Sequence, residues 1–303
     1  MSKKSDKVRG IWYALAAFTT WGVLPLYWRL MREVPPQQIL AHRISWSLLF
    51  VSFIITIQKR WNEAKGVFSL RQSKASFIVS ALFLGINWFI YIWAVNTNHV
   101  VESSMGYFIN PLVNVLLGVV FLKEKLTFWQ GISILLALGG VSYLTFHYGK
   151  VPWIALSLAF SFGTYGLLRK IAYAGSLIGL LAETSILTPV AMVYILIQHV
   201  HQIGFFGTSS LAVSFLLAGS GIVTALPIIW FAHSVRRIPL STVGFIQYLA
   251  PSLMLLLSVV VFKEPFTKTH MISFGLIWTA LTLYSVSHTK FMKNVALKTI
   301  RTL

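Results

Sequence analysis

Amide and aromatic side chains recur at helical spacing inside long apolar stretches of this chain. Tyr107, Asn110 and Asn114 are three and then four residues apart, which places them on one face of a helix. Because lipid offers an amide no hydrogen-bond partner, such a stripe must face either protein or water. We expect it to line a cavity that binds a small solute; the alternative is a set of hydrogen bonds between helices. The same expectation covers five further residues: Asn87, Trp88, Tyr91, Gln247 and Tyr248.

The few ionisable side chains inside or at the ends of the apolar stretches include His42, Arg43 and Glu183. Charge is costly at such positions, so each is a candidate for coupling solute movement to the binding and release of a proton. We expect Glu183 to matter more than His42, because His42 lies near the end of its stretch, where water can reach it. The alternative is structural: Arg43 would extend to the membrane surface, and Glu183 would pair locally or stay protonated.

Residues that carry out catalysis or hold cofactors are scarce. Asp6, in the N-terminal tail, is the only aspartate, so the chain lacks the acidic pairs that hold Mg²⁺ on a diphosphate. The chain has no cysteine and no phosphate-binding Gly-Lys-Ser/Thr loop. The sequence therefore predicts neither an enzyme nor a metal or cofactor site.

The elements that position these residues are membrane spans. Hydrophobic residues make up 56% of the chain and charged residues 11%, and the mean hydropathy is +0.75, far above the range of soluble domains. A helix needs about 20 apolar residues to cross the hydrocarbon core of a bilayer. The sequence therefore predicts an all-α integral membrane protein, embedded in the lipid bilayer, with ten transmembrane helices at 11–28, 38–57, 75–95, 103–122, 128–146, 151–168, 176–197, 209–232, 241–262 and 269–288.

The formal charge of +18 is explained by membrane orientation rather than by nucleic-acid binding. If the N-terminus is cytoplasmic, 19 of the 25 Lys and Arg residues fall on the cytoplasmic side of the ten spans and 6 on the outer side. Such a bias is the usual signal of orientation in a multi-pass protein. We expect both termini to be cytoplasmic and no nucleic-acid partner.

One phrase of the sequence occurs twice. Pro111 is followed after eleven residues by Lys123-Glu124, and Pro251 is followed after eleven residues by Lys263-Glu264. This indicates a duplication, with one five-helix repeat in residues 1–147, a second in 148–289 and a basic cytoplasmic tail in 290–303. Because each repeat has an odd number of spans, the second must be inverted. Pro111 and Pro251 occupy matching positions and are candidate hinges of the helices that open and close a solute path.

Several phrases make the resemblance to a known family specific. They are Trp21-Gly22, Ala41-His42-Arg43, Asn87-Trp88, Gly106-Tyr-Phe-Ile-Asn110-Pro111-Leu-Val-Asn114 and Gln247-Tyr248-x-Ala-Pro251. Together with the two repeats, they resemble the EamA repeat of the drug/metabolite transporter superfamily and, within it, the RarD group. The resemblance spans the whole chain. It implies a permease of the bacterial inner membrane, named in this group for chloramphenicol sensitivity, and relatives in the superfamily export amino acids, other metabolites or drugs as secondary carriers.

Two classes of function fit these features. The first is a secondary transporter, an exporter or permease, that moves a small polar or amphipathic metabolite or drug by alternating access. The second is a membrane receptor or assembly factor that keeps the same fold without moving solute. The expected partners are a small-molecule substrate and lipid, with proton coupling and a homodimer left open.

Overall fold

The computed structural model describes residues 3–69, 71–96, 100–149, 152–261 and 268–287. Within these ranges the chain forms helices joined by short connections, with no β-strand. The second copy of the repeated phrase, Lys263-Glu264, and the tail 290–303 lie outside the described residues. The helices are α1 (Lys3–Arg29), α2 (Pro36–Ile57), α3 (Trp61–Ser69), α4 (Arg71–Asn96), α5 (Val100–Leu122), α6 (Phe128–Tyr148), α7 (Trp153–Ile171), α8 (Ser176–Val200), α9 (Leu211–Val235), α10 (Leu240–Gln247), α11 (Leu249–Val260) and α12 (Lys268–Ser287).

These helices agree with the ten predicted spans. Seven stretches of the described chain are long and apolar enough to cross a membrane, and they lie in α2, α5, α6, α8, α9, the pair α10–α11, and α12. The other three predicted spans coincide with α1, α4 and α7. The apolar part of α4, Ala75–Tyr91, is shorter, and α1 and α7 are long enough but do not reach the same hydropathy.

The ninth predicted span differs from the expectation, because it is divided into α10 and α11 at Tyr248. Pro251 has no N–H to donate to the carbonyl one turn earlier, that of Gln247. Just before it, the amide of Tyr248 bonds to the carbonyl of Phe245, three residues back, at 3.3 Å. The regular ladder is therefore interrupted beside Pro251. By contrast, α5 continues through Pro111.

The connection 58–74 also differs from the expectation, because it contains the short helix α3. Its apolar side is small: Ala64 is buried and Val67 is half-buried against α4 and α8. Arg60 binds Glu63 across the first turn through two hydrogen bonds of 2.7 and 2.8 Å. An exposed helix with charged side chains and so small an apolar side suits the end of a bundle better than its membrane-facing side.

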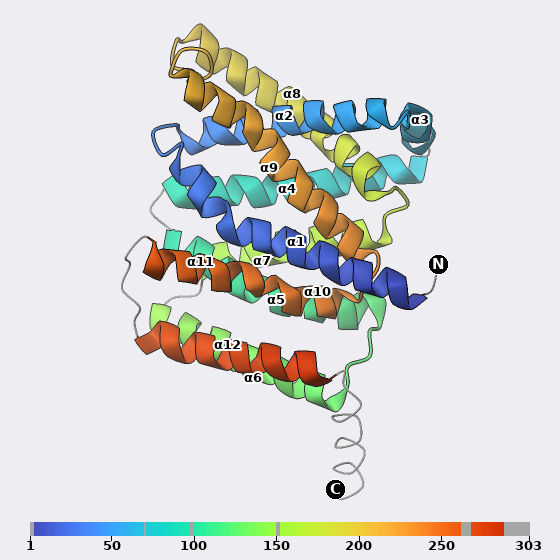
Figure 1. Cartoon of the computed structure of the whole chain (residues 1–303), viewed down its shortest axis with the longest axis vertical. Helices are drawn as coiled ribbons and strands as arrows, with labels where there is room; N and C mark the ends of the chain where they lie inside the picture. The colour runs from blue at the N-terminus through green and yellow to red at the C-terminus, as the bar shows by residue number, and fades with distance from the viewer. Residues whose placement is uncertain (1–2, 70, 97–99, 150–151, 262–267, 288–303) are drawn as a thin grey trace, which may run out of the picture.

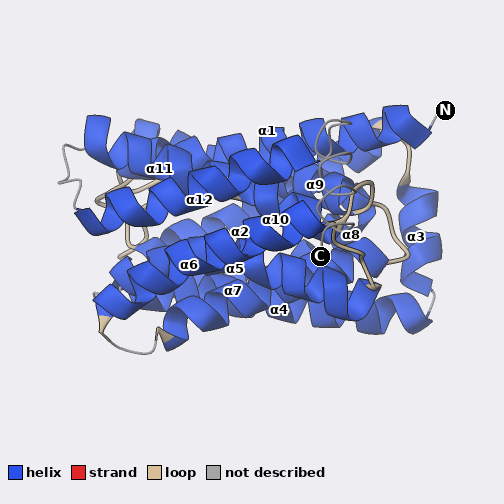
Figure 2. Cartoon of the chain, turned by 90° about the horizontal axis from the view of Figure 1, so that it is seen from below, coloured by secondary structure: helices blue, strands red, loops and turns tan. Residues whose placement is uncertain are grey.

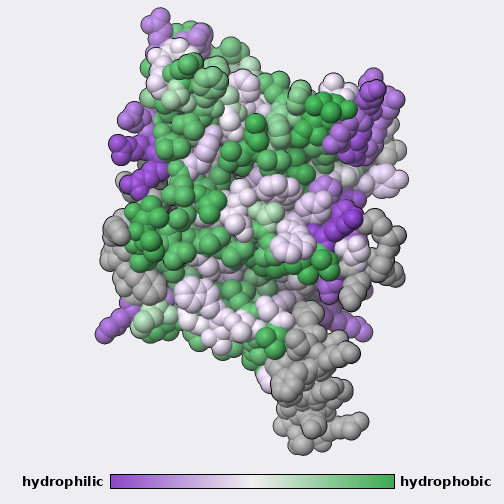
Figure 3. Space-filling view, in the orientation of Figure 1, coloured by the Kyte–Doolittle hydropathy of each residue, from purple (hydrophilic) through white to green (hydrophobic). Residues whose placement is uncertain are grey.

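Most of the long helices run roughly along one common axis, whereas α8 and α9 are inclined to it, as Figure 1 shows; Figure 2 gives the view from below. In the face of Figure 3, apolar residues cover the middle of the helices and hydrophilic residues gather at the two ends. Large apolar side chains with more than half of their surface exposed include Phe53, Leu135, Val190 and Phe215. A soluble protein would bury such side chains, whereas a lipid bilayer surrounds them with hydrocarbon.

The two repeats enter the bundle from opposite ends. In Figure 1, α1 begins at the right end, and α7, the first helix of the second repeat, begins at the left end. The last described helix, α12, finishes at the same end at which α1 begins. We call this end, which holds the start of α1, the N-terminal end of the bundle.

The packing of the helices follows the duplication. In chain order, the five spans of the first repeat are α1, α2, α4, α5 and α6. Their counterparts in the second repeat, in the same order, are α7, α8, α9, the pair α10–α11, and α12. Helix α5 packs on α7, and its counterpart α10–α11 packs on α1. In the same way α2 packs on α9 and α4 on α8, while α1 packs on α9 and α4 on α7. The remaining large contacts, α2–α8, α6–α12 and α5–α10, join each helix to its own counterpart.

Candidate functional site

Four of the predicted residues meet around one positive charge. Arg43 of α2 lies with its guanidinium carbon 4.8 Å from the ring centre of Trp88 in α4 and 5.4 Å from that of Trp28, near the end of α1. Tyr91 and Tyr107 are close enough to interact electrostatically with Arg43, and their own rings are 6.3 Å apart, edge to face. We call these five residues the Arg43 cluster. It lies toward the end of the bundle opposite the N-terminal end.

The charge of Arg43 is not balanced by a carboxylate among the described residues. Its Nε is buried and has no hydrogen-bond acceptor within the described part of the chain. The guanidinium lies beside two indole rings, one of them at the end of α1, so the alternative that Arg43 extends to the membrane surface stays a prediction. Contact with the faces of aromatic rings stabilises a cation by about 0.5–2 kcal/mol each but accepts no conventional hydrogen bond.

The amides of the fourth and ninth spans bind one another, and we call Asn110, Asn114 and Gln247 the amide network. Asn114 Nδ2 donates to Gln247 Oε1 at 2.6 Å and to Asn110 Oδ1 at 3.2 Å. Gln247 Nε2 also donates to Asn110 Oδ1, and Asn110 Nδ2 donates to the carbonyl of Ala159 in α7 at 2.8 Å. All three amides are buried. In this conformation they make the interhelical hydrogen bonds that were the alternative to a cavity lining, so contact with a solute stays a prediction for them.

Asn87 and Tyr248 are also drawn into the packing. Asn87 Nδ2 donates to the carbonyl of Leu158 and to Ser161 Oγ, both at 2.9 Å, which joins α4 to α7. Tyr248, at the break between α10 and α11, is 1% exposed, and its hydroxyl has no hydrogen-bond partner among the described residues. A role of either residue in binding a solute stays a prediction.

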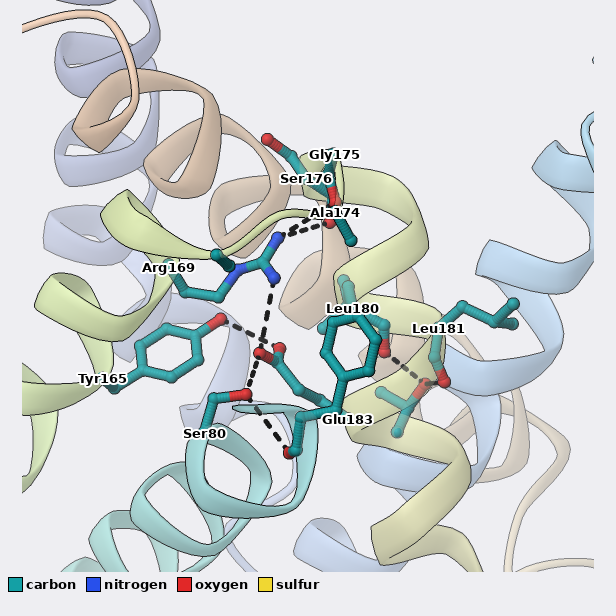
Figure 4. A network of polar contacts seen from close by, with 12 residues as sticks. Ser80, Tyr165, Arg169, Ala174, Gly175, Ser176, Leu180, Leu181 and Glu183 are labelled. Atoms are coloured by element: carbon teal, nitrogen blue, oxygen red, sulfur yellow. Dashed lines mark hydrogen bonds and ion pairs between the residues drawn. The ribbon is translucent and has the colours of Figure 1, made fainter. Parts of the chain in front are cut away.

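Glu183 lies at the centre of a buried polar network near the N-terminal end of the bundle (Figure 4). Ser80 of α4 and Tyr165 of α7 donate hydrogen bonds to its two carboxylate oxygens, at 2.7 and 3.2 Å. Arg169 Nη1 lies 3.7 Å from Glu183 Oε1, and the two side chains are 1% and 0% exposed. The local pairing considered for Glu183 is therefore present, with Arg169 as the partner. This does not decide its role in proton coupling, which stays a prediction.

The position of Arg169 depends on the absence of a side chain at Gly179. A Cβ at Gly179 would lie 1.8 Å from Arg169 Nη1, so glycine leaves the space that the guanidinium occupies. On its other side, Arg169 Nη2 donates to the carbonyls of Gly175 and Ser176 at 3.2 and 3.1 Å. These bonds hold the guanidinium against the turn before α8, as Figure 4 shows.

His42 lies apart from both groups. Its ring centre is 5.1 Å from that of Phe206, and the two residues line a small cavity between α2 and the end of α8, together with Gln38 and Tyr194. His42 is 6% exposed, so little of it faces open solvent, and contact with water through this cavity stays a prediction. Packing against Phe206, from the loop after α8, covers a side chain that the sequence places near the end of its span.

Several polar residues at the N-terminal end of the bundle were missed by sequence reasoning. Glu124 accepts hydrogen bonds from the backbone amides of Leu240 and Ser241, at 2.7 and 3.0 Å, and thereby caps the start of α10. Lys170 Nζ lies 3.8 Å from Glu124 Oε1 and donates to the carbonyl of Ile238 at 2.7 Å. The duplicated Lys-Glu phrase singled out Glu124 but could not reveal its partner. No repeated phrase of the sequence marked Ser80, Tyr165 or Arg169. Ser80 and Tyr165 lie inside predicted spans, and Arg169 directly follows one.

The two candidate hinges are placed differently by the structure. Pro251 lies beside the break between α10 and α11, whereas Pro111 lies inside the unbroken helix α5. The two helices touch at this level: a Cβ at Gly244 of α10 would lie 2.6 Å from the carbonyl oxygen of Pro111. Movement at either proline stays a prediction.

Comparison with known proteins gives consistent results over the whole chain. The profile of the EamA-like transporter family matches residues 8–146 and, a second time, residues 150–286. An uncharacterized transporter of Bacillus subtilis, YojE, is 41% identical over 293 residues, which cover 95% of this chain and 97% of that protein. Protein RarD of Escherichia coli is 40% identical over 276 residues, covering 91% of this chain and 93% of the relative.

A solved crystal structure has a similar fold. It superposes with a TM-score of 0.71 at 17% sequence identity, and the match covers 95% of this chain and all of the solved one. At this identity the likeness concerns the arrangement of the helices alone.

Proposed function

Because this chain belongs to the EamA-like transporter family, and within it to the RarD group, we propose that it is a secondary transporter. Its proposed substrate is a small polar or amphipathic metabolite or drug, which it would export across the bacterial inner membrane by alternating access. The multi-pass fold supports a membrane location, and the bacterial relatives support the inner membrane. No catalytic step, cofactor or metal forms part of the proposal.

The observation that carries the proposal is the equivalence of the contacts between the two repeats. Exchanging the repeats turns the α5–α7 contact into the α10–α11 contact with α1, and the α2–α9 contact into the α8–α4 contact. Two arrangements in which the repeats swap these roles would therefore bury similar surfaces. A pair of states of similar free energy, each open to one side, is what alternating access needs.

The contacts at the N-terminal end of the bundle support a closed state at that end. Glu124 joins the end of α5 to the start of α10, and Lys170 joins α7 to the turn after α9. We take this end to be cytoplasmic, because most Lys and Arg residues lie on that side. Opening toward the cytoplasm would then require these hydrogen bonds to break, and Pro251, beside the break in the ninth span, is the better placed of the two candidate hinges.

Glu183 is the proposed site of proton coupling. A proton on its carboxylate would remove the charge that faces Arg169 at 3.7 Å and would weaken the contact of α7 with α8. Such a change lies at the same end of the bundle as the Glu124 contacts, so protonation and opening could be linked there. His42 lies away from this end and is a weaker candidate for the same role.

Flux measurements in reconstituted vesicles test the proposal. Vesicles with the purified protein are loaded with a panel of labelled amino acids, carboxylic acids and chloramphenicol, and release is compared with protein-free vesicles. Faster release of at least one solute is expected. Binding without release would identify a receptor instead, and release that does not respond to an imposed pH gradient would leave a uniporter.

The coupling step needs a variant that loses the carboxylate without leaving a buried, unpaired cation. The double change Arg169→Met with Glu183→Gln removes both charges, and Arg60→Met with Glu63→Gln removes an exposed ion pair as the matched control. We expect the first double variant to keep flux down a solute gradient but to lose the response to pH. An unchanged response would remove Glu183 from the mechanism. Crosslinking of the protein in the same vesicles would test for a homodimer, which the proposal does not require.

A further inference from the structure

Arg43 differs from four other basic side chains of the described chain. Arg60, Arg169, Lys170 and Arg237 each lie within 4 Å of a carboxylate. Arg43 has no carboxylate at that distance among the described residues, although it lies inside a span, where an unbalanced charge is most costly. A charge kept in such a place with no counter-ion among the described side chains is available to an anionic ligand.

We propose that Arg43 binds the carboxylate of the transported solute, with Trp28 and Trp88 covering the solute's apolar part. This inference rests on the proposed function and names its substrate class: small monoanionic or zwitterionic carboxylates with an apolar or aromatic body. Three features of the Arg43 cluster carry it, and each corresponds to one part of such a molecule.

The first feature is the set of free donors. The buried Nε of Arg43 has no acceptor within the described chain, and a guanidinium can present two parallel N–H donors to a carboxylate. A carboxylate only accepts hydrogen bonds, so it fits a site whose protein atoms are donors. The hydroxyls of Tyr91 and Tyr107 are hydrogen-bonded to each other, so one O–H of the pair stays free to donate near Arg43.

The second feature is the aromatic wall. The rings of Trp28 and Trp88 lie within 5.4 Å of the guanidinium carbon and come from α1 and α4, two separate helices of the first repeat. Such surfaces favour an apolar or aromatic body over a strongly hydrated one. The third feature is the single charge: one guanidinium balances a monoanion, whereas a phosphate dianion would leave a negative charge in the span.

Tyr107 gives the Arg43 cluster an exposed edge. Tyr107 is 36% exposed and lies near the start of the fourth span, whereas Trp88 is 8% exposed. The cluster also lies toward the end of the bundle opposite the Glu124 and Lys170 contacts. In the proposed alternating-access cycle this end is the open one while those contacts are closed, so a solute would reach Arg43 from this side.

The test compares carboxylates with their uncharged counterparts on the purified full-length protein in detergent. Benzoate, phenylacetate and L-phenylalanine are each paired with the corresponding carboxamide, and binding is followed by the rise in melting temperature, because a ligand that binds the folded state stabilises it. At least one carboxylate should raise the melting temperature while its carboxamide does not. Equal effects within every pair, or no effect of any carboxylate, would overturn the proposal without the use of a variant.

Three variants then locate the binding. Arg43→Gln should lower the affinity for the stabilising carboxylate about tenfold to a hundredfold, the range expected for a lost hydrogen bond to a charged group. Arg43→Lys keeps the charge without the planar fork and should fall between Arg43→Gln and wild type. Arg32→Gln, an exposed position near the same end, is the matched control and should bind as wild type. An unchanged affinity in Arg43→Gln would overturn the assignment.

Glu102 provides a further control, because its side chain lies outside the described part of the chain and it is close in sequence to Tyr107. If Glu102 were the counter-ion of Arg43, Glu102→Gln would free the guanidinium and increase carboxylate binding. An increase of more than about threefold would count against the inference that Arg43 has no carboxylate partner within the protein. If vesicles show no flux of any solute while Arg43-dependent binding is preserved, the proposal of a transporter is overturned and the carboxylate site stands.

Discussion

The buried pair of Arg169 and Glu183 should be sensitive to the loss of either partner and much less sensitive to the loss of both. The closest charged atoms are 3.7 Å apart and the side chains are 1% and 0% exposed. At an effective dielectric constant of about 20, two unit charges at this distance attract each other by roughly 4–5 kcal/mol. Removing one partner forfeits this attraction and leaves the other charge buried, which usually costs about 3–5 kcal/mol.

The double variant behaves differently, because no unbalanced charge remains. Arg169→Met fills a similar volume with apolar atoms, and Glu183→Gln still offers an oxygen to Ser80. The carbonyls of Gly175 and Ser176 lose their donor, so some cost persists. We expect about 2 kcal/mol or less for the double change, far below the sum of the single changes.

The assay is equilibrium unfolding of the four proteins of this mutant cycle in mixed detergent micelles, with helix content as the signal. The exposed pair Arg60 and Glu63 is the matched control: its atoms approach to 2.7 Å, and hydrogen bonding to Arg60 lowers the pKa of Glu63, yet the side chains are 36% and 45% exposed. Solvent screening should limit its loss to less than about 1 kcal/mol. Additive costs in the buried cycle, or single costs as small as those of the exposed pair, would refute the reasoning that burial makes this pair strong.

Three further predictions follow from other parts of the structure. Asn114→Leu should lower the free energy of unfolding by about 1–3 kcal/mol, because it leaves Gln247 without its donor in a buried site; an unchanged unfolding curve would favour a water-filled cavity around the amides. Glu124→Gln should cost about 1 kcal/mol through its weaker cap on α10, and should raise the labelling of cysteines introduced at the N-terminal end of the bundle, whereas equal labelling would argue against a closed end there. Because the chain has no cysteine, single changes also report orientation: a membrane-impermeant maleimide should label Ser209→Cys in intact cells and Lys65→Cys only after the membrane is opened, and the reverse result would contradict cytoplasmic termini.

Much of the fold could be predicted from the sequence, because each membrane-spanning helix must itself be apolar along its length. A span must be apolar for about 20 residues whatever it packs against, so the ends of the predicted spans agree with the described helices to within four residues, except that α1 begins eight residues earlier than predicted. The duplication at Pro111 and Pro251 likewise predicted two repeats, and the profile of the EamA-like transporter family matches the chain twice. The break at Tyr248 and the short helix α3 were not predicted, since a proline signals a lost hydrogen bond without saying how far the helix is disturbed.

The site itself depended on tertiary structure. The spacing of Asn110 and Asn114 predicted a shared helix face, but only packing could show that this face meets Gln247 and forms hydrogen bonds with it. The same limit applies to charges. Glu183 pairs with Arg169 from the preceding helix, whereas Arg43 lies beside two indole rings with no carboxylate partner among the described residues. A sequence records which groups are costly to bury, and the fold decides which of them are balanced, because balance depends on neighbours from other helices.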